Sequence, residues 1–440
     1  MVKNKKIGVI SLGCDKNRVD TEKMLAVLCR RHTPVNDIND ADIVVINTCA
    51  FLAAARKEAI EEILSVAELK KTGKLEKIIV TGCLPQKFSK ETFPALNEAD
   101  IFLGVGDYEN INEAIDKSYE KDGERYNLVG TCSVECGTDR VLTTSGYAYL
   151  KISEGCSNHC TYCLIPSIRG SFRSFPKEKL FEEAAKLGEV NELILVAQDL
   201  TGYGGDLTPK SNLTDLIRTL SPLNNVKGIR LLYCYPEGIT DELIHEMQVN
   251  AKVIRYIDIP LQHASDRILK LMNRRGNYDF YLSLINKLKR EVPGIAIRST
   301  FITGFPTETD EDVETLIKFL NEAKLSSVGF FKYSKEEGTA AARLEGQIKQ
   351  SVKTARLKKL YAAQKKIVKQ TGKSLIGKMF KVVAEGFDEN MLAYFGRAYM
   401  HAPDVDGKVY FFSEDEVEYG KFYNVKIIKS DGYDLYGERI

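Results

Sequence analysis

The N-terminal part of the chain repeats one pattern three times: a short run rich in Ile and Val ends in a turn and a cysteine. These runs lead to Cys14, Cys49 and Cys83, and helical segments such as 21–31 and 53–71 lie between them. Buried β-branched strands that alternate with helices are typical of a parallel, doubly wound sheet. Sites in such sheets form at the carboxyl ends of the strands. The pattern therefore predicts an α/β domain in which three thiols meet at one edge.

From about residue 142 to 345, apolar strands and amphipathic helices alternate six times. The expected strands are 147–153, 192–197, 228–234, 253–259, 296–303 and 327–333, and the helices between them include 176–187, 241–247, 278–291 and 310–323. Thr309 precedes acidic residues, which is typical of a helix N-cap. Six such units predict an open, partial (β/α)6 barrel rather than a closed eightfold one.

The last part of the chain changes pattern again. Residues 348–373 carry many Lys and Arg on a helical period and predict a connecting helix. About five β-rich runs with Gly and Asp-Gly turns follow, as in a small antiparallel, OB-like β-barrel. A chain of 440 residues is too long to fold around a single hydrophobic core. We therefore expect domains at 1–141, at 142–374 with the connecting helix, and at 375–440.

Composition limits the class of protein. The chain has 440 residues, of which 28% are charged, and its net charge is +1. No apolar run reaches the roughly 18 residues of a membrane span, and no signal segment follows the basic N-terminus. We therefore expect a cytoplasmic protein without a membrane partner. In that compartment its ten cysteines are better explained as metal ligands, catalytic groups or buried thiols than as disulfides.

A second group of three cysteines follows the first strand of the central domain, with the spacing C-x3-C-x2-C: Cys156, Cys160 and Cys163. Iron–sulfur cubanes are normally held by four thiolates. Three thiolates leave one iron open, and an open position distinguishes a catalytic metal site from a structural one. The alternative is a zinc knuckle or reduced structural thiols, but the loop lacks a fourth Cys or a His pair at zinc-finger spacing. The three N-terminal cysteines are interpreted in the same way, although each alone would more often be a buried thiol.

The C-x3-C-x2-C loop, with Tyr162 before its last cysteine, resembles the radical S-adenosylmethionine (SAM) superfamily. The three-cysteine N-terminal domain, the radical SAM domain and the C-terminal barrel, similar to a TRAM domain, together resemble the methylthiotransferase family. That resemblance implies two [4Fe–4S] clusters and S-adenosyl-L-methionine as cofactors. Cys156, Cys160 and Cys163 would bind the radical-generating cluster. Cys14, Cys49 and Cys83 would bind an auxiliary cluster that handles sulfur.

Other candidate residues lie at strand ends of the central domain, where barrel sites form. Gly304 and Phe305 resemble the strand end that lies beside the adenine and ribose in this superfamily, and Tyr162 stands where it carries an aromatic residue near the adenine. Each could instead be a polar or apolar group that completes a loop. No side-chain acid or base is predicted. The cofactor candidates are Tyr162, Gln198, Arg298, Gly304 and Phe305, and the substrate candidates are Gln262 and His263.

The strings at 11–20 and 256–265 resemble the branch of the family that modifies an aspartate of small-subunit ribosomal protein twelve. Residues 375–440 contain 8 Lys and Arg but 12 Asp and Glu. An acidic barrel is poorly suited to tRNA, which is bound through cationic contacts, and better suited to a basic ribosomal protein. The acidic turn 414–418 is a candidate contact.

The resemblance implies methylthiolation of the β-carbon of that aspartate, with a reductant such as flavodoxin or ferredoxin as a further partner. The C–H bond there is not acidic enough for a side-chain base. One alternative is the tRNA-adenosine methylthiotransferase. Another is a non-catalytic iron–sulfur electron-transfer or RNA-binding protein, which would not cleave SAM. Cys132 and Cys136 are predicted to be linker thiols.

Overall fold

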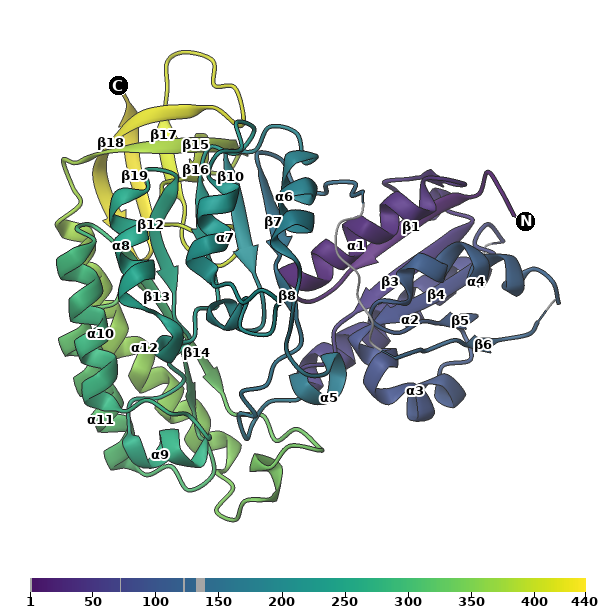
Figure 1. The fold of residues 1–440 in the computed structure, drawn as a ribbon, viewed down its shortest axis with the longest axis horizontal. Coiled ribbons are helices and arrows are strands. Elements are labelled where there is room, and N and C mark those ends of the chain that lie inside the picture. The colour runs from purple at the N-terminus through teal and green to yellow at the C-terminus, as the bar shows by residue number, and fades with distance from the viewer. Residues whose placement is uncertain (1, 72, 122, 132–138) are drawn as a thin grey trace.

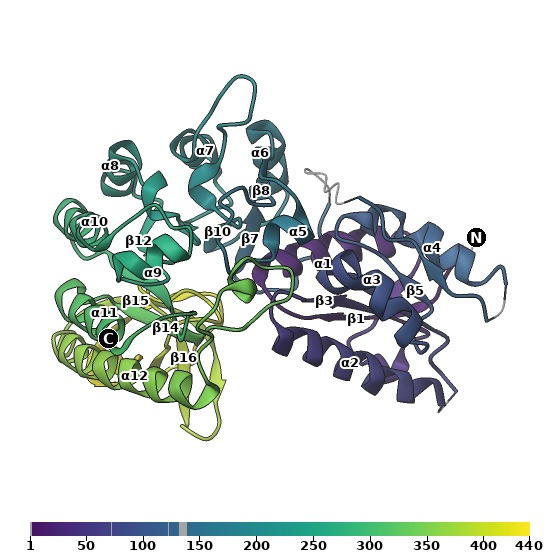
Figure 2. The same cartoon turned by 90° about the horizontal axis from the view of Figure 1, so that it is seen from below.

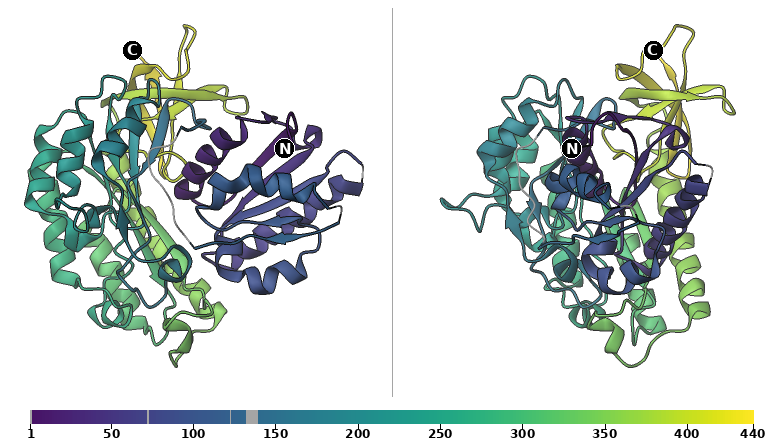
Figure 3. Two further views of the ribbon diagram at one scale, coloured as in Figure 1. Left: turned by 45° about the vertical axis from the view of Figure 1, so that its right-hand side comes forward. Right: turned by 90° about the vertical axis from the view of Figure 1, so that its right-hand side faces the viewer.

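The computed structural model describes residues 2–71, 73–121, 123–131 and 139–440. Two smaller bodies, an N-terminal α/β domain and a C-terminal barrel, flank a larger central domain (Figures 1 and 3). Cys132 and Cys136, predicted to be linker thiols, lie outside the described residues. None of the helices in the described ranges is long and apolar enough to cross a membrane.

The N-terminal domain is built on a sheet of six parallel strands, in the order β2-β1-β3-β4-β5-β6. Figure 2 shows α2 on one face of this sheet and α1 and α4 on the other. Every residue of β3 and β4 is buried, as expected for a sheet covered on both faces. The strands are β1 (Lys6–Ser11), β2 (Thr33–Pro34), β3 (Ile43–Thr48), β4 (Lys77–Gly82), β5 (Ile101–Phe102) and β6 (Tyr126–Asn127), and the helices are α1 (Asp15–Leu28), α2 (Ala53–Lys71), α3 (Cys83–Ala95) and α4 (Ile111–Ser118).

The central domain contains a second sheet of six parallel strands, joined in the order of the chain from β7 to β14. Its two end strands do not pair with each other, so the barrel is partial and open, as predicted. The strands are β7 (Tyr147–Lys151), β10 (Glu192–Val196), β11 (Ile229–Leu231), β12 (Val253–Asp258), β13 (Ala296–Thr303) and β14 (Ser327–Lys332). The helices are α5 (Ile165–Arg169), α6 (Lys177–Ala185), α7 (Leu213–Leu220), α8 (Asp241–Val249), α9 (Asp266–Leu271), α10 (Tyr278–Glu291), α11 (Asp310–Ala323) and α12 (Gln350–Lys373).

Several predicted boundaries hold and others shift for a local reason. Thr309 caps α11 with a capping box, as predicted. The first helix begins at Asp15 rather than at 21, because Gly13, at φ +90°, turns the chain directly from β1 into α1. Strand β11 is shorter than predicted, since Tyr233 has φ +64° and leaves the sheet. The predicted strand 147–153 is divided, because β8 (Ser153–Glu154) pairs antiparallel with β9 (Arg173–Ser174) in a separate hairpin.

The C-terminal domain is a closed five-stranded barrel in the order β15-β16-β17-β19-β18. Its pairings are antiparallel, as predicted, except that of β17 with β19, which is parallel. The core includes Val382, Val409, Phe411 and Ile427. The strands are β15 (Met379–Asp388), β16 (Ala393–Arg397), β17 (Val409–Phe412), β18 (Phe422–Asp431) and β19 (Asp434–Arg439).

The segment from Arg397 to Asp406 fastens the barrel to the central sheet. Arg397 Nη1 lies 3.1 Å from Glu192 Oε2, and Tyr256 donates a hydrogen bond of 2.6 Å to Asp406 Oδ2. All four side chains are largely or fully buried. Charges buried and paired in this way resist separation.

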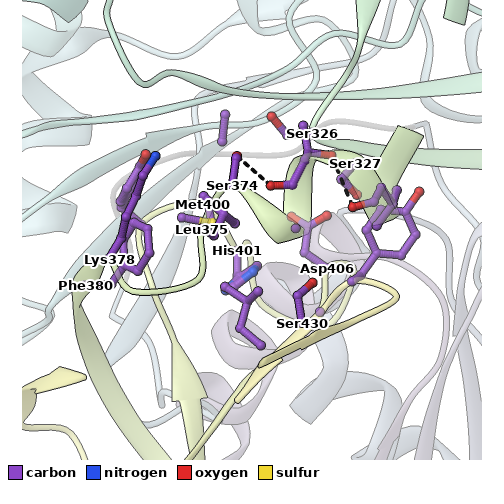
Figure 4. Close-up of a pocket in the computed structure, with 18 of the residues that line it drawn as sticks. Ser326, Ser327, Ser374, Leu375, Lys378, Phe380, Met400, His401, Asp406 and Ser430 are labelled. Carbon is purple, nitrogen blue, oxygen red and sulfur yellow. Dashed lines mark hydrogen bonds between the residues drawn. The ribbon is translucent and has the colours of Figure 1, made fainter. Parts of the chain in front are cut away.

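A cavity of about 370 Å³ lies between this segment, the end of α12 and the amino ends of β13 and β14 (Figure 4). Its lining includes Ser326, Ser327, Ser374, His401 and Asp406. Active sites of β/α barrels form at the carboxyl ends of the strands. The cavity therefore lies at the opposite edge of the sheet from the cysteine loop.

Candidate functional site

The three N-terminal thiols follow three neighbouring strands, as predicted. Cys14 is the N-cap of α1 after β1, Cys49 follows β3, and Cys83 begins α3 directly after β4. The strand order reverses between β1 and β3, and such a switch point is where ligands bind in open α/β sheets. Cys14 is exposed, Cys49 half-buried and Cys83 buried.

Glycines allow these strand ends to approach one another. A Cβ on Gly13 would lie 2.6 Å from Cys49 Cβ. A Cβ on Gly82, at φ +93°, would lie 2.3 Å from Asn47 Oδ1. Both distances are too short for real atoms, so the two turns that carry Cys14 and Cys83 require glycine.

The thiols are close enough to influence one another. Burial raises the pKa of Cys83 to about 12; Arg169 opposes this rise, and Cys14 and Cys49 add to it. Burial likewise raises the pKa of Cys49, with a contribution from Cys14. The fold therefore brings the three predicted ligands together at a site that extends from the buried Cys83 to the exposed Cys14.

The second set of cysteines, Cys156, Cys160 and Cys163, lies in one loop after β8. Cys163 N donates a hydrogen bond to Cys160 O (3.0 Å), and Cys156 N donates to Gly170 O (3.1 Å). A Cβ on Gly155 would lie 2.2 Å from Ser171 O, so the loop begins with a required glycine. Burial raises the pKa of Cys163 to about 12, and Cys160 and Cys156 add to it. These three thiols are also brought together.

The chemistry of both sets fits an iron–sulfur cluster better than a single metal ion. Within the described residues, no three His, Cys, Asp or Glu side chains are placed to share one ion. A cubane takes each thiolate on a different iron, so its ligands stand apart around a shared space. Buried thiols keep their protons until a metal replaces them. Each set could hold a [4Fe–4S] cluster with one open iron.

A buried charge network joins the two sets, and sequence reasoning missed it. Arg169, at the end of α5, reaches from the central domain to Asn17 Oδ1 (2.5 Å) and Cys83 Sγ (3.6 Å) in the N-terminal domain. Its Nη1 lies 2.9 Å from Glu154 Oε2. Lys151 pairs with the same Glu154 oxygen at 2.9 Å and with Asp20. The available signal was that Lys151 and Glu154 interrupt an otherwise apolar run directly before the cysteine loop.

The network keeps the Glu154 carboxylate charged. Burial acts to raise the pKa of Glu154, but Arg169 and Lys151 outweigh it and hold that pKa below its usual range. Gln198, a predicted cofactor residue, donates to Glu154 Oε1 (3.2 Å). Its own Oε1 is buried without a hydrogen-bond partner in the described part of the chain. An unpaired buried acceptor is costly, so this oxygen fits a ligand donor.

Three of the predicted cofactor residues lie around one apolar cluster. Tyr162 packs on a group that contains Phe305, Met272 and Tyr333. Gly304, with φ +74°, donates its N–H to Glu308 Oε2 at 2.8 Å. The structure therefore brings Tyr162, Gly304 and Phe305 to one side of the cysteine loop.

Arg298 lies elsewhere. Its Nη1 is 2.9 Å from Asp258 Oδ1, and its Nε is 3.6 Å from Asp406 Oδ1 in the barrel-docking segment. These contacts connect Arg298 to the barrel and not to the cysteine loop. The cofactor contact predicted for it stays a prediction.

Of the two predicted substrate residues, His263 is fully buried. Its Nδ1 accepts hydrogen bonds from the N–H groups of Ala264 and Ser265, both 2.9 Å, which places its proton on Nε2, 3.3 Å from Glu308 Oε1. Through Glu308, His263 supports the turn at Gly304. Gln262, with φ +72°, is bound to β13 through its backbone. The substrate role of both stays a prediction.

Two tyrosines after β11 face the two sets of cysteines. Tyr235 Oη lies 3.9 Å from Cys160 Sγ. The ring of Tyr233 lies 3.4 Å from Lys16 Nζ, beside Cys14, and its hydroxyl is 3.4 Å from Asp15 Oδ1. A single strand end therefore contributes to both candidate sites.

Comparison with known proteins defines the class. The chain matches the radical SAM superfamily over residues 150–320, the uncharacterized protein family UPF0004 over 6–104, and the TRAM domain over 376–440. The solved structure of the cobalamin-dependent S-adenosylmethionine radical enzyme OxsB, with aqua-cobalamin and S-adenosylmethionine bound, has a TM-score of 0.53 at 14% identity. The match covers 83% of this chain and 56% of that chain and shows the fold alone. The protein is a radical SAM enzyme, a class whose cofactors are SAM and iron–sulfur clusters.

Close relatives then define the family. The ribosomal protein uS12 methylthiotransferase RimO of Clostridium botulinum (strain Eklund 17B / Type B) is 45% identical over 436 residues, which cover 98% of this chain and 97% of that protein. The RimO of Lachnoclostridium phytofermentans is 46% identical over 439 residues, which cover 98% and 99%. The chain belongs to the RimO family of uS12 methylthiotransferases. The predicted family, fold class and enzyme class are confirmed.

Proposed function

We propose that this chain transfers a methylthio group to an aspartate of ribosomal protein uS12. The observation that carries the proposal is the pair of three-thiol sites, one in each of two adjacent α/β domains, joined by a buried charge network. Two sites that each leave one iron open suit a reaction that must generate a radical and supply sulfur. An electron carrier gains nothing from two open irons.

The residues that would hold the cofactors follow from this geometry. Cys156, Cys160 and Cys163 would hold one [4Fe–4S] cluster, and Cys14, Cys49 and Cys83 the other. When bound, the clusters and SAM supply a 5′-deoxyadenosyl radical and the methylthio group. The chain has no need of an acid or base at the substrate, because the β-carbon hydrogen is not removed as a proton.

The remaining candidates would position SAM. Tyr162, which packs on the buried Phe305, offers an apolar surface for the adenine, and Gly304 turns the chain directly before Phe305 at φ +74°. Gln198 Oε1, buried and unpaired in the described ranges, would accept a hydrogen bond from SAM. Glu154, Gln198's partner, stays ionised and fixes the orientation of that amide.

The C-terminal barrel supports a protein substrate rather than tRNA. Glu414, Asp415, Glu416 and Glu418 are all exposed. Phe412, Tyr419 and Phe422 beside them are 51%, 59% and 44% exposed. Acidic and aromatic groups together suit a basic protein surface, whereas a phosphate backbone requires cations. We define these seven residues as the acidic face of the barrel.

The test is an anaerobic assay of the cluster-reconstituted protein with SAM and a reductant such as flavodoxin, ferredoxin or dithionite. Ribosomal protein uS12 and tRNA are offered side by side, and both are analysed by mass spectrometry. We expect a methylthio group in place of one hydrogen on uS12, together with 5′-deoxyadenosine.

Other outcomes separate the alternatives. The same mass gain on tRNA alone would retain the chemistry and overturn the protein substrate. A protein that holds iron and sulfide but forms neither product nor 5′-deoxyadenosine would be an electron carrier or a binding protein.

A further inference from the structure

Arg169 belongs to the central domain but ends among residues of the N-terminal domain. It is 1% exposed, and its Nη2 lies 3.6 Å from Cys83 Sγ and 2.5 Å from Asn17 Oδ1. Asn17 in turn donates hydrogen bonds of 3.0 Å to the carbonyl oxygens of Leu12 and Thr48, each two residues or fewer from a candidate ligand. The guanidinium therefore lies against the backbone that carries the N-terminal thiols.

The other side of Arg169 is tied to the radical SAM loop. Its Nη1 is 2.9 Å from Glu154 Oε2, and Glu154 Oε1 accepts the N–H of Gly155, which precedes Cys156. The carbonyl of Gly170, next to Arg169, accepts the N–H of Cys156 at 3.1 Å. The backbone at the first cysteine of this loop is thus bound to Glu154 and to Gly170, and Arg169 between them contacts Cys83.

The charges of the network balance without the thiols. Lys151 and Arg169 carry two positive charges, and Asp20 and Glu154 carry two negative ones, all buried. Buried pairs of this kind hold fixed geometry, since separating them leaves an uncompensated charge. Hydrogen bonds to sulfur and nearby charge set the reduction potential of iron–sulfur clusters.

We propose that Arg169 is a positioning residue that donates a hydrogen bond to the Cys83 thiolate, raises the reduction potential of the cluster held by Cys14, Cys49 and Cys83, and fixes this site relative to the radical SAM loop. The proposal rests on the proposed function, which assigns a cluster to those three cysteines. It predicts that a cation, and not only a well-packed interface, is required at this position.

Arg140 supplies a matched control. Its guanidinium is also buried at this interface, where it pairs with Glu22 on α1 and with Glu183 Oε1 at 3.0 Å. Within the described residues, its hydrogen bonds go to Tyr149, Glu183 and Glu22 and to no cysteine. Arg140→Gln therefore breaks buried ion pairs with α1 and α6 without removing a charge from the thiols.

The experiment uses the full chain with Cys156, Cys160 and Cys163 all replaced by Ala, so that only the N-terminal site can hold iron. Arg169→Gln, Arg169→Lys and Arg140→Gln are made in this background, reconstituted with iron and sulfide, and titrated against redox mediators with detection by electron paramagnetic resonance. We expect a lower midpoint potential in Arg169→Gln, an intermediate one in Arg169→Lys, and the parent value in Arg140→Gln.

Equal potentials in the parent and Arg169→Lys, together with an equal shift in Arg140→Gln and Arg169→Gln, would overturn the proposal. If Arg169→Gln fails to fold, the midpoint potential of Arg169→Lys is compared with that of the parent instead. This variant retains the charge and loses the paired hydrogen bonds, so an unchanged potential would overturn the proposal. A parent protein that binds no iron at all would overturn the proposed function instead. In the otherwise wild-type chain, Arg169→Gln should raise the ratio of 5′-deoxyadenosine to methylthio product, and Arg140→Gln should leave it unchanged.

Discussion

Cys156, Cys160 and Cys163 lie in one short loop, whereas Cys14, Cys49 and Cys83 come from three strand ends far apart in the sequence. The first set is arranged by local hydrogen bonds such as Cys163 N to Cys160 O. The second set exists only when a whole parallel sheet has formed, and it is completed by Arg169 from another domain. Damage to the loop should therefore act on one site, while damage to the sheet or the interface should act on the N-terminal site in particular.

Removing one cysteine from each set gives the largest expected contrast. Cys160→Ala should abolish both 5′-deoxyadenosine and methylthio product, because the radical cannot be generated. Cys83→Ala should retain 5′-deoxyadenosine formation and lose the methylthio product. Chromatography with mass spectrometry of both species after one anaerobic incubation measures this. Methylthio product from the Cys83→Ala protein would show that the role given to the N-terminal domain is wrong.

A second comparison concerns stability, at two glycines with positive φ: Gly82 beside the N-terminal thiols and Gly188 away from them. Gly82→Ala places a Cβ 2.3 Å from Asn47 Oδ1 and 2.6 Å from Thr48 O at a positive φ, which should lower the free energy of unfolding by about 3 kcal/mol. Gly188 has φ +71°, but a Cβ added there would meet no atom within 4 Å. Gly188→Ala should therefore cost only about 1 kcal/mol.

Urea denaturation and iron content measure this second prediction. Gly82→Ala should lose iron from the N-terminal site while SAM cleavage continues. Equal losses of stability in the Gly82→Ala and Gly188→Ala proteins would mean that the close contact at β4 is relieved by backbone movement.

The segment that docks the barrel contains no cysteine, and its stability should depend on pH through His401. Burial lowers the pKa of His401 to about 4; Asp406 opposes this shift, and Arg230 and Arg397 add to it. Between about pH 4 and 6.5, His401 therefore binds a proton in the unfolded chain but not in the folded chain. The stability contributed by the neutral ring is complete above about pH 6.5 and should fall by about 2 kcal/mol between pH 7 and 5.

Denaturation curves of the wild type and of His401→Gln at pH 7 and 5 test this third prediction. The variant should lose less stability on acidification than the wild type. Identical losses in the two proteins would assign the acid sensitivity to other groups.

The smallest effect is expected at the acidic face. Glu414→Lys with Glu416→Lys should weaken uS12 binding several-fold, because exposed charges contribute about 0.2–1 kcal/mol each. The difference should shrink at high salt, and SAM cleavage without uS12 should not change. Fluorescence anisotropy with labelled uS12 at two salt concentrations measures it, and Glu389→Lys serves as the control on another exposed turn. Equal affinities for all three proteins would move the substrate contact elsewhere.

Sequence patterns predicted those features that depend on periodicity. Alternating strands and helices gave the order of elements, and the rule that sites lie at strand ends placed Cys14, Cys49 and Cys83 together. The same reasoning could not identify Arg169 as their neighbour. Its partners Asn17 and Glu154 come from different domains, and no periodicity records which surfaces of two domains meet. His263 shows a second limit of this reasoning, since a polar residue after a strand can contact a substrate or support a turn from within the core, and the sequence pattern is the same in both cases.

The docking of the barrel has a consequence for the choice of target. Because Arg397 and Glu192 pair in the buried interface and Tyr256 is bound to Asp406, the barrel cannot swing freely relative to the cysteines. A partner protein bound to the acidic face is therefore held at a fixed position relative to the cysteines. In the partner protein, the chain between the part bound to the acidic face and the aspartate to be modified must be long enough to span the distance to the thiols. If that chain is too short or too long, the effective concentration of the aspartate at the thiols is low. Which aspartate is modified thus becomes a question of reach as much as of the sequence around it.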